Sequence, residues 1–417
     1  MAGEPIVLHS GRNGYPAALR FPAYLIALCL AFTLPANAQT QQSGGTIAPP
    51  SISARHAVLM DYANGSFLFE RAADTPVPPA SLTKLMTMEL VFKALHEKKL
   101  TLEQELPVSV NAWRKGGAPS GGSTMFASVN SRISVENLIQ GVTVVSGNDA
   151  AIAFAEALGG SEEQFAVQMT RRAHELGYDT ANFRNATGLD DPEHKISVRD
   201  LAKLSAHLIR DYPEYYRYYG EREFTWNKIT QKNRNPLLDM DIGADGLKTG
   251  YTKEAGYSLA GSAVQNGVRL IAVVSGSPSI KERGEDARRL LEWGFKNFDS
   301  QPLVKADEIV GEAMVYGGES RYVPLKAEQQ LGVFTQHGDT ARLLVRIVYT
   351  GPLQVPVVKG TEVARLKAWR GKRLVLDAPL VAAADVPEGG LMRRALDGAY
   401  ELTVDLLREA LSKLKRS

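Results

Sequence analysis

The sequence predicts an α+β protein whose sheet is mainly antiparallel, and the order of its residue patterns carries this prediction. Strand-like patterns occupy residues 56–70, several helical patterns lie between Val135 and Tyr212, and strands return after about Gly243. A sheet completed by segments so distant in sequence is typical of the α+β class. With 44% hydrophobic and 23% charged residues among 417, the composition is that of an ordinary globular chain.

An export signal is expected over residues 1–38. Phe21–Leu34 is an apolar run that follows Arg12 and Arg20, and Pro35–Ala38 provides an A-x-A-like cleavage site. An uncleaved membrane anchor is the alternative, but residues 21–34 fall short of the roughly 20 apolar residues that span a bilayer. We therefore expect cleavage after export.

Several site classes are not expected in the mature chain. The only cysteine, Cys29, lies inside the apolar run, so no disulfide or cysteine metal site remains, and Ala27-Leu28 before it make a poor lipoprotein box. None of the seven histidines has H-E-x-x-H spacing, so no metal or cofactor is expected. A net charge of +2 gives no reason to expect a nucleic-acid partner.

Residues 39–53, rich in Gln, Ser, Gly and Pro, are expected to form a flexible lead-in. A hairpin follows, because Asn64-Gly65 separates the apolar runs His56–Met60 and Ser66–Glu70. The proline-rich segment Pro76–Pro79 stops the second strand, and Ala80–Lys98 has the apolar spacing of a helix.

Three further strands are expected over Leu247–Tyr251, Gly256–Ala263 and Val268–Val274, and a helix over about Gly284–Asn297. With the hairpin, they complete the sheet of a catalytic domain over residues 54–298.

A small β-rich domain is expected over residues 299–390, where short runs of Val and Leu alternate with Gly and Pro. Residues 391–417 have the spacing of an amphipathic helix. Such a helix either docks on its own domain or lies on a membrane surface, and its position beyond the Pro387–Gly390 breaker favours the membrane.

The pattern Ser81-Leu82-Thr83-Lys84 lies where the first helix is expected to begin. A serine and a lysine three residues apart share one helix face, so the amine can act as a base for the hydroxyl. The simpler interpretation is a helix N-cap beside a solvated lysine. The spacing recurs at Ser412–Lys415, whose two polar residues lie off the apolar stripe of the tail helix, so we discard that copy.

Two further motifs follow in order. Ser146-Gly147-Asn148 interrupts two apolar helical runs, unlike the copies at Ser109–Asn111 and Ser128–Asn130, although a plain interhelical turn remains an alternative. Lys248-Thr249-Gly250 opens a strand, where a lysine and a threonine can hold a carboxylate and the glycine allows a substrate backbone to approach. An ordinary surface lysine beside a turn is the alternative for this motif.

Taken together, S-x-x-K, S-x-N and K-T-G are the signature of penicillin-binding proteins and class A β-lactamases. The surrounding residues, Pro79–Thr87, Ser146–Ala151 and Asp245–Gly250, resemble the low-molecular-mass D-alanyl-D-alanine carboxypeptidases from about His56 through Phe295, and more loosely to the C-terminus. The resemblance implies a penicillin-binding transpeptidase/β-lactamase-like domain with a helical subdomain, then a β-rich domain and a tail helix.

This resemblance also implies the chemistry. A Ser81 acyl-enzyme would remove the terminal D-alanine from peptidoglycan stem pentapeptides, and β-lactam antibiotics would acylate the same serine. The enzyme would act at the periplasmic face of the cytoplasmic membrane.

The family's site residues transfer to matching positions. Ser81 would be the nucleophile, Lys84 its general base, and Ser146 with Asn148 a proton relay that also holds substrate. The substrate-binding positions are Lys248, Thr249, Gly250, Tyr251, Arg283 and Arg234. Lys248 and Thr249 would bind the terminal carboxylate and assist proton movement, Arg283 matches a carboxylate-binding arginine of the family, and Arg234 matches a second arginine of its cleft. The oxyanion hole would use the backbone N–H groups of Ser81 and Tyr251, where some relatives have histidine.

Other functions remain open on the sequence. A class A β-lactamase deacylates with a glutamate in an E-x-x-L-N pattern, which Asn185–Glu193 does not contain. An endopeptidase that cuts peptidoglycan crosslinks would use the same catalytic residues. A non-enzymatic binding module with a degenerate site is disfavoured, since no motif is missing.

Overall fold

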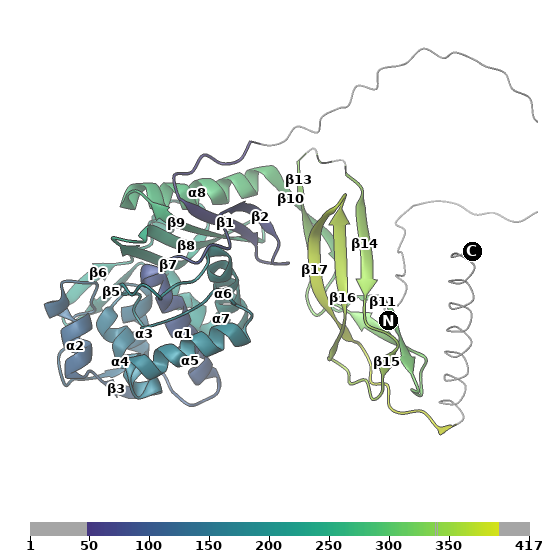
Figure 1. Cartoon of the computed structure of the whole chain (residues 1–417), viewed down its shortest axis with the longest axis horizontal. Helices are drawn as coiled ribbons and strands as arrows, with labels where there is room; N and C mark the ends of the chain where they lie inside the picture. Colours follow the sequence, from purple (N-terminus) through teal and green to yellow (C-terminus); the bar gives the residue numbers. More distant parts are fainter. Residues whose placement is uncertain (1–47, 338, 340, 392–417) are drawn as a thin grey trace, which may run out of the picture. The chain divides into compact units, whose positions relative to one another are not determined.

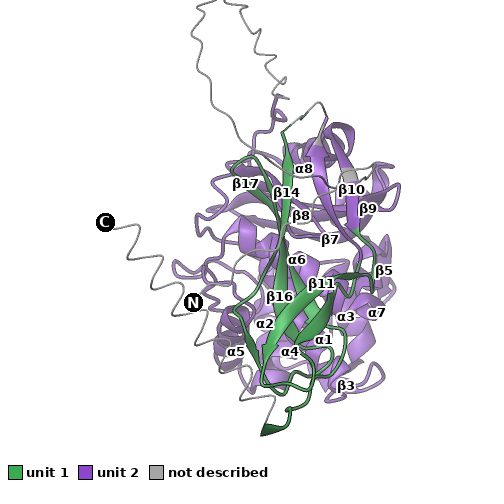
Figure 2. Ribbon diagram, turned by 90° about the vertical axis from the view of Figure 1, so that its right-hand side faces the viewer, with its two compact units in different colours: residues 1–47, 304–329, 338–417 green, residues 48–303, 330–337 purple. Residues whose placement is uncertain are grey.

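The computed structural model describes residues 48–337, 339 and 341–391. Contacts divide them into two compact units (Figure 2). We call residues 48–303 and 330–337 the first unit, which is purple and labelled unit 2 in the figure, and residues 304–329 with the described residues from 339 to 391 the second unit, which is green and labelled unit 1. The predicted signal (1–38), most of the lead-in (39–47) and the tail helix after 391 lie outside the described residues.

The first unit is built on a five-stranded sheet in the order β2-β1-β9-β8-β7, with every pair antiparallel. Its strands are β1 (His56–Asp61), β2 (Phe67–Arg71), β7 (Ala244–Thr252), β8 (Gly256–Gln265) and β9 (Val268–Ser277). The α+β prediction with antiparallel pairing is therefore confirmed, and β7, which carries the K-T-G motif, is an edge strand.

Both faces of this sheet are buried, because alternate residues of each strand enter different hydrophobic cores. On β1, Val58 and Met60 join the larger core with the helical subdomain, whereas Ala57 and Leu59 join the core formed with α8 (Ile280–Asn297). Figure 1 shows α8 along one face and helices such as α1 and α6 on the other.

The helical subdomain lies between the hairpin and β7 in sequence. Its α-helices are α1 (Lys84–His96), α2 (Val110–Gly116), α3 (Val135–Thr143), α4 (Asn148–Gly159), α5 (Glu162–Glu175), α6 (Val198–Asp211) and α7 (Pro213–Tyr216). The 3-10 turns η1 (Ala80–Thr83), η2 (Ala118–Ser120), η3 (Arg217–Gly220) and η4 (Pro236–Asp239) and the strands β3 (Glu105–Pro107), β4 (Arg132–Ser134), β5 (Glu223–Trp226) and β6 (Ile229–Lys232) complete it.

Two boundaries differ from the sequence prediction. The predicted helix 80–98 begins as a 3-10 turn over Ala80–Thr83 and becomes α-helical only at Lys84. The predicted helix 284–297 begins earlier, at Ile280, because the Ser279 side chain accepts a hydrogen bond from the Glu282 N–H and caps it. The Asn64-Gly65 hairpin forms as predicted, between β1 and β2.

The second unit contains a six-stranded sheet in the order β14-β16-β17-β12-β11-β15. These strands are β11 (Ile309–Tyr316), β12 (Tyr322–Lys326), β14 (Leu343–Val348), β15 (Leu353–Gln354), β16 (Glu362–Arg370) and β17 (Arg373–Ala382). The pair β10 (Phe298–Val304) and β13 (Leu331–Gln336) belongs almost wholly to the first unit, within the range predicted as the β-rich domain.

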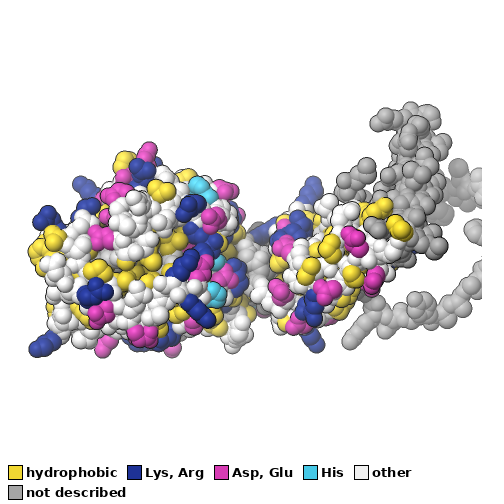
Figure 3. Space-filling view, turned by 90° about the horizontal axis from the view of Figure 1, so that it is seen from below, with side chains coloured by type: hydrophobic (Ala, Val, Ile, Leu, Met, Phe, Trp, Pro, Cys, Tyr) yellow, Lys and Arg dark blue, Asp and Glu magenta, His cyan; other side chains and the backbone are white. Residues whose placement is uncertain are grey.

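Charged side chains of both signs are interspersed on the face that Figure 3 displays. No helix in the described part of the chain combines the length and apolar character needed to cross a membrane.

The carboxylate of Asp286 joins three segments of the first unit. Its oxygens accept hydrogen bonds from the Ser53 N–H and hydroxyl, the Ala54 N–H and the Ser277 hydroxyl, at 2.8 to 2.9 Å. Asp286 is fully buried on α8, so its removal would leave these donors without an acceptor.

We expect Asp286→Ala to lower the free energy of unfolding by about 3 kcal/mol, because four donors, those of Ala54 and Ser277 being buried, lose their shared acceptor. Thermal and urea unfolding of the purified variant would measure this loss. Asp179→Ala, at an exposed carboxylate, is the control and should unfold like the wild type. Equal stability of the two variants would contradict the role of Asp286.

Candidate active site

Ser81 lies in the 3-10 turn η1 and caps no helix. Neither η1 nor α1 has a side-chain cap, which removes the simpler interpretation of Ser81 as an N-cap. Ala80 before it has φ +50°, a left-handed conformation that costs energy in a residue with a Cβ. The half-buried serine is therefore held by a strained turn at the start of a buried helix.

The amine of Lys84 is fully buried and makes three polar contacts. It lies 3.1 Å from Ser81 Oγ, 2.7 Å from Asn148 Oδ1 and 2.7 Å from the Thr187 carbonyl oxygen. Burial lowers the pKa of this amine from 10.5 to about 7, and the negative charges of Asp149 and Glu162 oppose that shift. A substantial fraction of Lys84 is therefore neutral near pH 7.

These contacts orient a neutral Lys84. A neutral amine has two N–H groups and one lone pair, while an amide oxygen and a peptide carbonyl are acceptors only. Asn148 Oδ1 and the Thr187 carbonyl take the two N–H groups, so the lone pair points to Ser81 Oγ, whose hydroxyl can donate to it. This is the arrangement that a base for Ser81 requires.

The S-G-N motif lies at the start of α4. Ser146 has φ +64° and is buried, and the Asn148 N–H donates to the Ser123 carbonyl at 2.8 Å. The neighbouring Asp149 accepts hydrogen bonds from Thr124 Oγ1 and the Met125 N–H, which ties the 123–127 loop to this motif. The motif is thus a fixed, buried junction, and not a plain interhelical turn.

The two other copies of this pattern have separate structural positions. Ser109 caps α2 by accepting a hydrogen bond from the Ala112 N–H, and Asn130 lies in a turn with φ +61°.

The K-T-G motif lies in the middle of edge strand β7. Lys248 and Thr249 are both buried, which excludes an ordinary surface lysine. Burial lowers the pKa of Lys248 well below its usual value, and the positive charges of Lys84, Arg283 and Arg234 lower it further. A positive charge on Lys248 is therefore costly in the free site, and an anion beside it would be stabilised.

Gly250 brings β7 against the nucleophile. A Cβ at Gly250 would lie 3.0 Å from the Pro79 carbonyl oxygen and 3.2 Å from the Ser81 nitrogen. The approach of a substrate backbone to this glycine stays a prediction, and the protein's own backbone at Pro79 and Ser81 also lies close to it. The lack of a side chain at Gly250 therefore allows the K-T-G strand to lie this close to Ser81.

Arg283 projects from α8 toward the same strand. Its guanidinium is buried, donates to the Gly250 carbonyl at 3.4 Å and lies over the Tyr257 ring at 5.8 Å. Burial lowers the pKa of Arg283 to about 10, and its Nε has no hydrogen-bond partner among the described residues. A buried and incompletely paired guanidinium is suited to binding a carboxylate.

Tyr251 and Arg234 are the exposed residues among the predicted substrate-binding positions. Tyr251 is 54% exposed and its ring stacks on Tyr257 with 4.3 Å between centroids. Arg234 is exposed and donates to Gln231 Oε1 at 3.1 Å, while its backbone N–H donates to the Val144 carbonyl, close to the S-G-N motif.

The Thr187 carbonyl is the part of the site that the sequence analysis missed. It belongs to a turn in which Asn185 Oδ1 accepts from the N–H groups of Thr187 and Gly188, at 3.1 and 2.7 Å. Gly188 has φ +83°, and a Cβ there would lie 1.7 Å from the Ala80 carbonyl oxygen. An Asn followed three residues later by Gly is a turn signal, but a backbone acceptor leaves no side-chain signature.

In the described part of the chain, no group of histidine, cysteine or acidic side chains is arranged to hold a metal ion.

Comparisons with known proteins agree with this geometry. A model of the D-alanyl-D-alanine carboxypeptidase family matches residues 43–279, and a model of the penicillin-binding protein 5 C-terminal domain matches residues 298–388. The D-alanyl-D-alanine carboxypeptidase DacA of Haemophilus influenzae is 37% identical over 90% of this chain and 95% of its own length.

Solved structures give the same result. Penicillin-binding protein 5 from Haemophilus influenzae superposes with a TM-score of 0.72 at 38% identity, over 82% of this chain and all of that one. A Listeria monocytogenes penicillin-binding protein solved with ampicillin bound has a TM-score of 0.52 at 31% identity, over 60% of this chain and 99% of that one.

These matches confirm the predicted fold and serine hydrolase class, and they support the carboxypeptidase prediction over the β-lactamase and endopeptidase alternatives. The match to the penicillin-binding protein 5 C-terminal domain also confirms a β-rich domain after the catalytic one. The chain belongs to the D-alanyl-D-alanine carboxypeptidase family of penicillin-binding proteins.

Proposed function

We propose that Ser81 and Lys84 carry out the carboxypeptidase reaction on peptidoglycan stem pentapeptides. The observation that carries this proposal is the Lys84 amine, buried with two pure acceptors so that its lone pair faces Ser81 Oγ at 3.1 Å. Lys84 takes the Ser81 proton while Oγ attacks the carbonyl carbon of the penultimate D-alanine. The peptide C–N bond breaks, the leaving amine takes a proton, and free D-alanine departs.

The second half of the reaction returns the enzyme to its starting state. A water molecule gives a proton to the neutral amine of Lys84 and attacks the acyl carbon. The C–O bond to Ser81 breaks, Ser81 regains its proton, and the shortened peptide leaves. Ser146 would relay the proton to the leaving amine in the first half, and Asn148 would hold both Lys84 and the substrate.

The terminal carboxylate of the substrate would bind among Lys248, Thr249 and Arg283. The support for this role is the cluster of cations around Lys248. Burial and their charges disfavour the charged form of Lys248, and burial disfavours the charge of Arg283, until an anion enters. Arg234, at the exposed side of the cluster, would attract the same carboxylate more weakly. Substrates with a blocked C-terminus would lose this interaction.

The oxyanion of the tetrahedral intermediate would be stabilised by the backbone N–H groups of Ser81 and Tyr251. The close approach of β7 to Ser81 at Gly250 supports this role, because it brings the two chain segments together. Each donor of this kind contributes roughly 3 kcal/mol to the transition state. Because the donor is backbone, tyrosine at position 251 affects substrate fit and not the reaction class.

A β-lactamase mechanism receives less support. The segment 185–193 presents the Thr187 carbonyl to Lys84, and Glu193 is exposed, so this segment places no carboxylate on the amine. The buried Glu162 accepts instead from the Ala186 N–H at 3.4 Å and lies 3.6 Å from Lys115. A long-lived penicillin adduct on Ser81 is therefore expected.

We further propose that the enzyme is exported and acts at the periplasmic face of the cytoplasmic membrane. The apolar run before Ala38 and the amphipathic spacing after Gly390 support this location.

Incubation with a D-Ala-D-Ala-terminated pentapeptide and, separately, with a labelled penicillin tests the proposed function. We expect free D-alanine from the peptide and a stable adduct that maps to Ser81, because Lys84 serves both reactions. Fast penicillin turnover without peptide cleavage would instead identify a β-lactamase. Cleavage of crosslinked dimers without release of D-alanine would identify an endopeptidase.

Lys84→Ala should abolish acylation by penicillin in a folded protein, because the only base that contacts Ser81 Oγ in the described residues is removed. Stopped-flow labelling together with circular dichroism measures both properties. In the wild type, the acylation rate should rise with pH around a midpoint near 7, as Lys84 loses its proton. Rapid labelling of the folded Lys84→Ala variant would remove Lys84 from the mechanism.

Truncation after Gly390 should release the protein from membrane fractions without loss of carboxypeptidase activity, because the amphipathic segment would be the only anchor once the signal is cleaved. Sedimentation of the two forms with membrane vesicles measures this. Unchanged sedimentation of the truncated protein would refute the anchor.

A further inference from the structure

Residues 186–199 run antiparallel to residues 73–87, the segment that contains the nucleophile. Contacts recur in opposite order along the two segments: Arg199 N–H to the Ala73 carbonyl, mutual backbone bonds between Val77 and Ile196, the Thr83 hydroxyl to His194, the Lys84 amine to the Thr187 carbonyl, and the Thr87 hydroxyl to the Ala186 carbonyl. Residues 186–199 therefore lie along the chain segment that leads into the Ser81–Lys84 motif.

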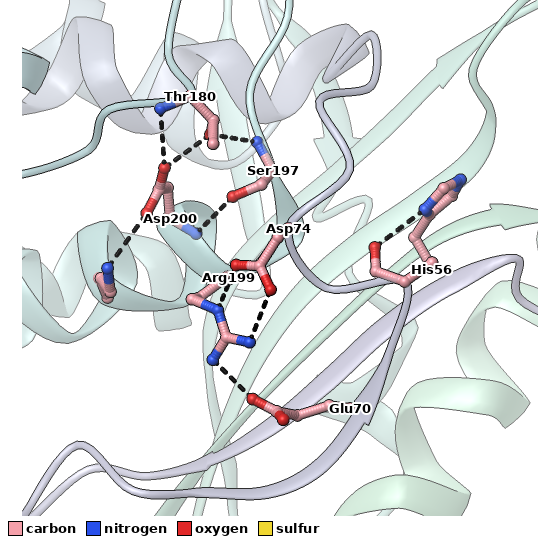
Figure 4. A network of polar contacts seen from close by, with 9 residues as sticks. His56, Glu70, Asp74, Thr180, Ser197, Arg199 and Asp200 are labelled. Atoms are coloured by element: carbon pink, nitrogen blue, oxygen red, sulfur yellow. Dashed lines mark hydrogen bonds and ion pairs between the residues drawn. The ribbon is translucent and has the colours of Figure 1, made fainter.

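The end of this pairing far from Ser81 is held by exposed ion pairs. Arg199 binds Asp74 through Nε and Nη2 at 2.6 and 3.0 Å and Glu70 through Nη1 at 2.5 Å (Figure 4). Nearby, Thr180 Oγ1 donates to Asp200 Oδ2 at 2.6 Å and accepts from the Ser197 N–H at 2.9 Å. This end anchors the start of α6 to the chain that follows β2.

His194 joins the two segments next to Lys84, and both of its ring nitrogens are used. Nε2 lies 2.8 Å from Thr83 Oγ1, and Nδ1 lies 3.1 Å from the Arg184 nitrogen. A backbone N–H can only donate, so Nδ1 must be the unprotonated acceptor and Nε2 carries the proton. Nε2 therefore donates to Thr83.

The surroundings of His194 keep its imidazole ring neutral. Its ring is buried, with an edge-to-face contact to Phe183 at 5.5 Å between centroids. Burial lowers the pKa of His194 to about 4, with the nearby charge of Asp191 opposing this and the positive charges of Arg184 and Lys84 adding to it. The unprotonated Nδ1 therefore persists at neutral pH, and the ring adds no positive charge beside Lys84.

Each partner of His194 adjoins a group that contacts the amine of Lys84. Thr83 directly precedes Lys84, and Arg184 directly precedes the Asn185–Leu189 turn, whose Thr187 carbonyl accepts from that amine. The imidazole ring thus links the residue before Lys84 to the residue before the turn that carries the Thr187 carbonyl.

We propose that His194 is a positioning residue for the acylation step, holding the Thr187 carbonyl in register with Lys84. This inference rests on the proposed roles of Ser81 and Lys84. Without the ring, the turn can move away from the amine and water can enter. Because burial is the largest cause of the lowered pKa of Lys84, entry of water would raise that pKa and misdirect the lone pair.

The test measures the acylation rate constant at saturating penicillin as a function of pH in His194→Ala and His194→Gln. For His194→Ala we expect a rate on the order of 10-fold lower, since small displacements at a reacting group are costly. We also expect the midpoint near pH 7 to move to higher pH. Glutamine can still donate to Thr83 but offers no acceptor at Nδ1, so its rate should lie between those of alanine and the wild type.

His174→Asn is the matched control. His174 Nε2 lies 2.9 Å from the Ala181 carbonyl oxygen in the same subdomain, without contact to the S-x-x-K motif. Its acylation rate and pH midpoint should equal those of the wild type, whatever its melting temperature. A purely structural role for His194 would lower the melting temperature of its variants and leave the rate and midpoint of the folded fraction unchanged.

A double-mutant cycle with Thr83→Val completes the test. If the histidine acts through Thr83, the double variant with His194→Ala should be no slower than the slower single variant. Additive losses, or wild-type rate and midpoint in both His194 variants, would overturn the inference. Absence of penicillin labelling on Ser81 in the wild type would instead overturn the proposed function, so the two failures are distinguishable.

Discussion

The desolvated amine of Lys84 is the constraint on which the rest of the site depends. An exposed lysine is protonated at neutral pH and has no lone pair to offer. Burial at the start of α1 brings its pKa to about 7, and two acceptors from distant segments, Asn148 and Thr187, then decide where the lone pair points. Lowering a lysine pKa by about 3 units costs roughly 4 kcal/mol, and the surrounding fold must supply that energy.

The fold supplies it by closing three chain segments around one helix turn. Gly250 lets β7 approach the Ser81 backbone, and Gly188, with φ +83°, lets the 185–189 turn approach Ala80. The third segment is the 123–127 loop, which the carboxylate of Asp149 ties to the S-G-N motif. Each contact excludes water from the amine. The glycines flanking this site are therefore packing requirements of the protein itself.

How much of this could be predicted from sequence depends on whether a feature has a side-chain signature. The Asn64-Gly65 hairpin and the Ser81, Ser146 and Lys248 motifs have such signatures, and the structure brings the motif segments together. The Thr187 carbonyl has none, because any residue carries a backbone oxygen. The grouping of β10 and β13 with the first unit was also missed. Strand patterns reveal where strands lie in sequence but not which strand they pair with.

The cations beside the nucleophile must stay charged to bind a carboxylate, whereas Lys84 must be neutral to act as a base. Burial lowers the pKa of Lys248, and the positive charges of neighbouring groups such as Arg283 and Arg234 lower it further, so a charge on Lys248 is costly in the free site. In the proposed mechanism, the terminal carboxylate of the substrate would remove this cost and favour full protonation of Lys248. Carboxylate binding and protonation of Lys248 are then thermodynamically linked. The free energy by which the bound carboxylate favours charged Lys248 equals the free energy by which charged Lys248, compared with neutral Lys248, favours carboxylate binding. Neutral Lys84 near it lets one site hold both an anion-binding cation and an uncharged base.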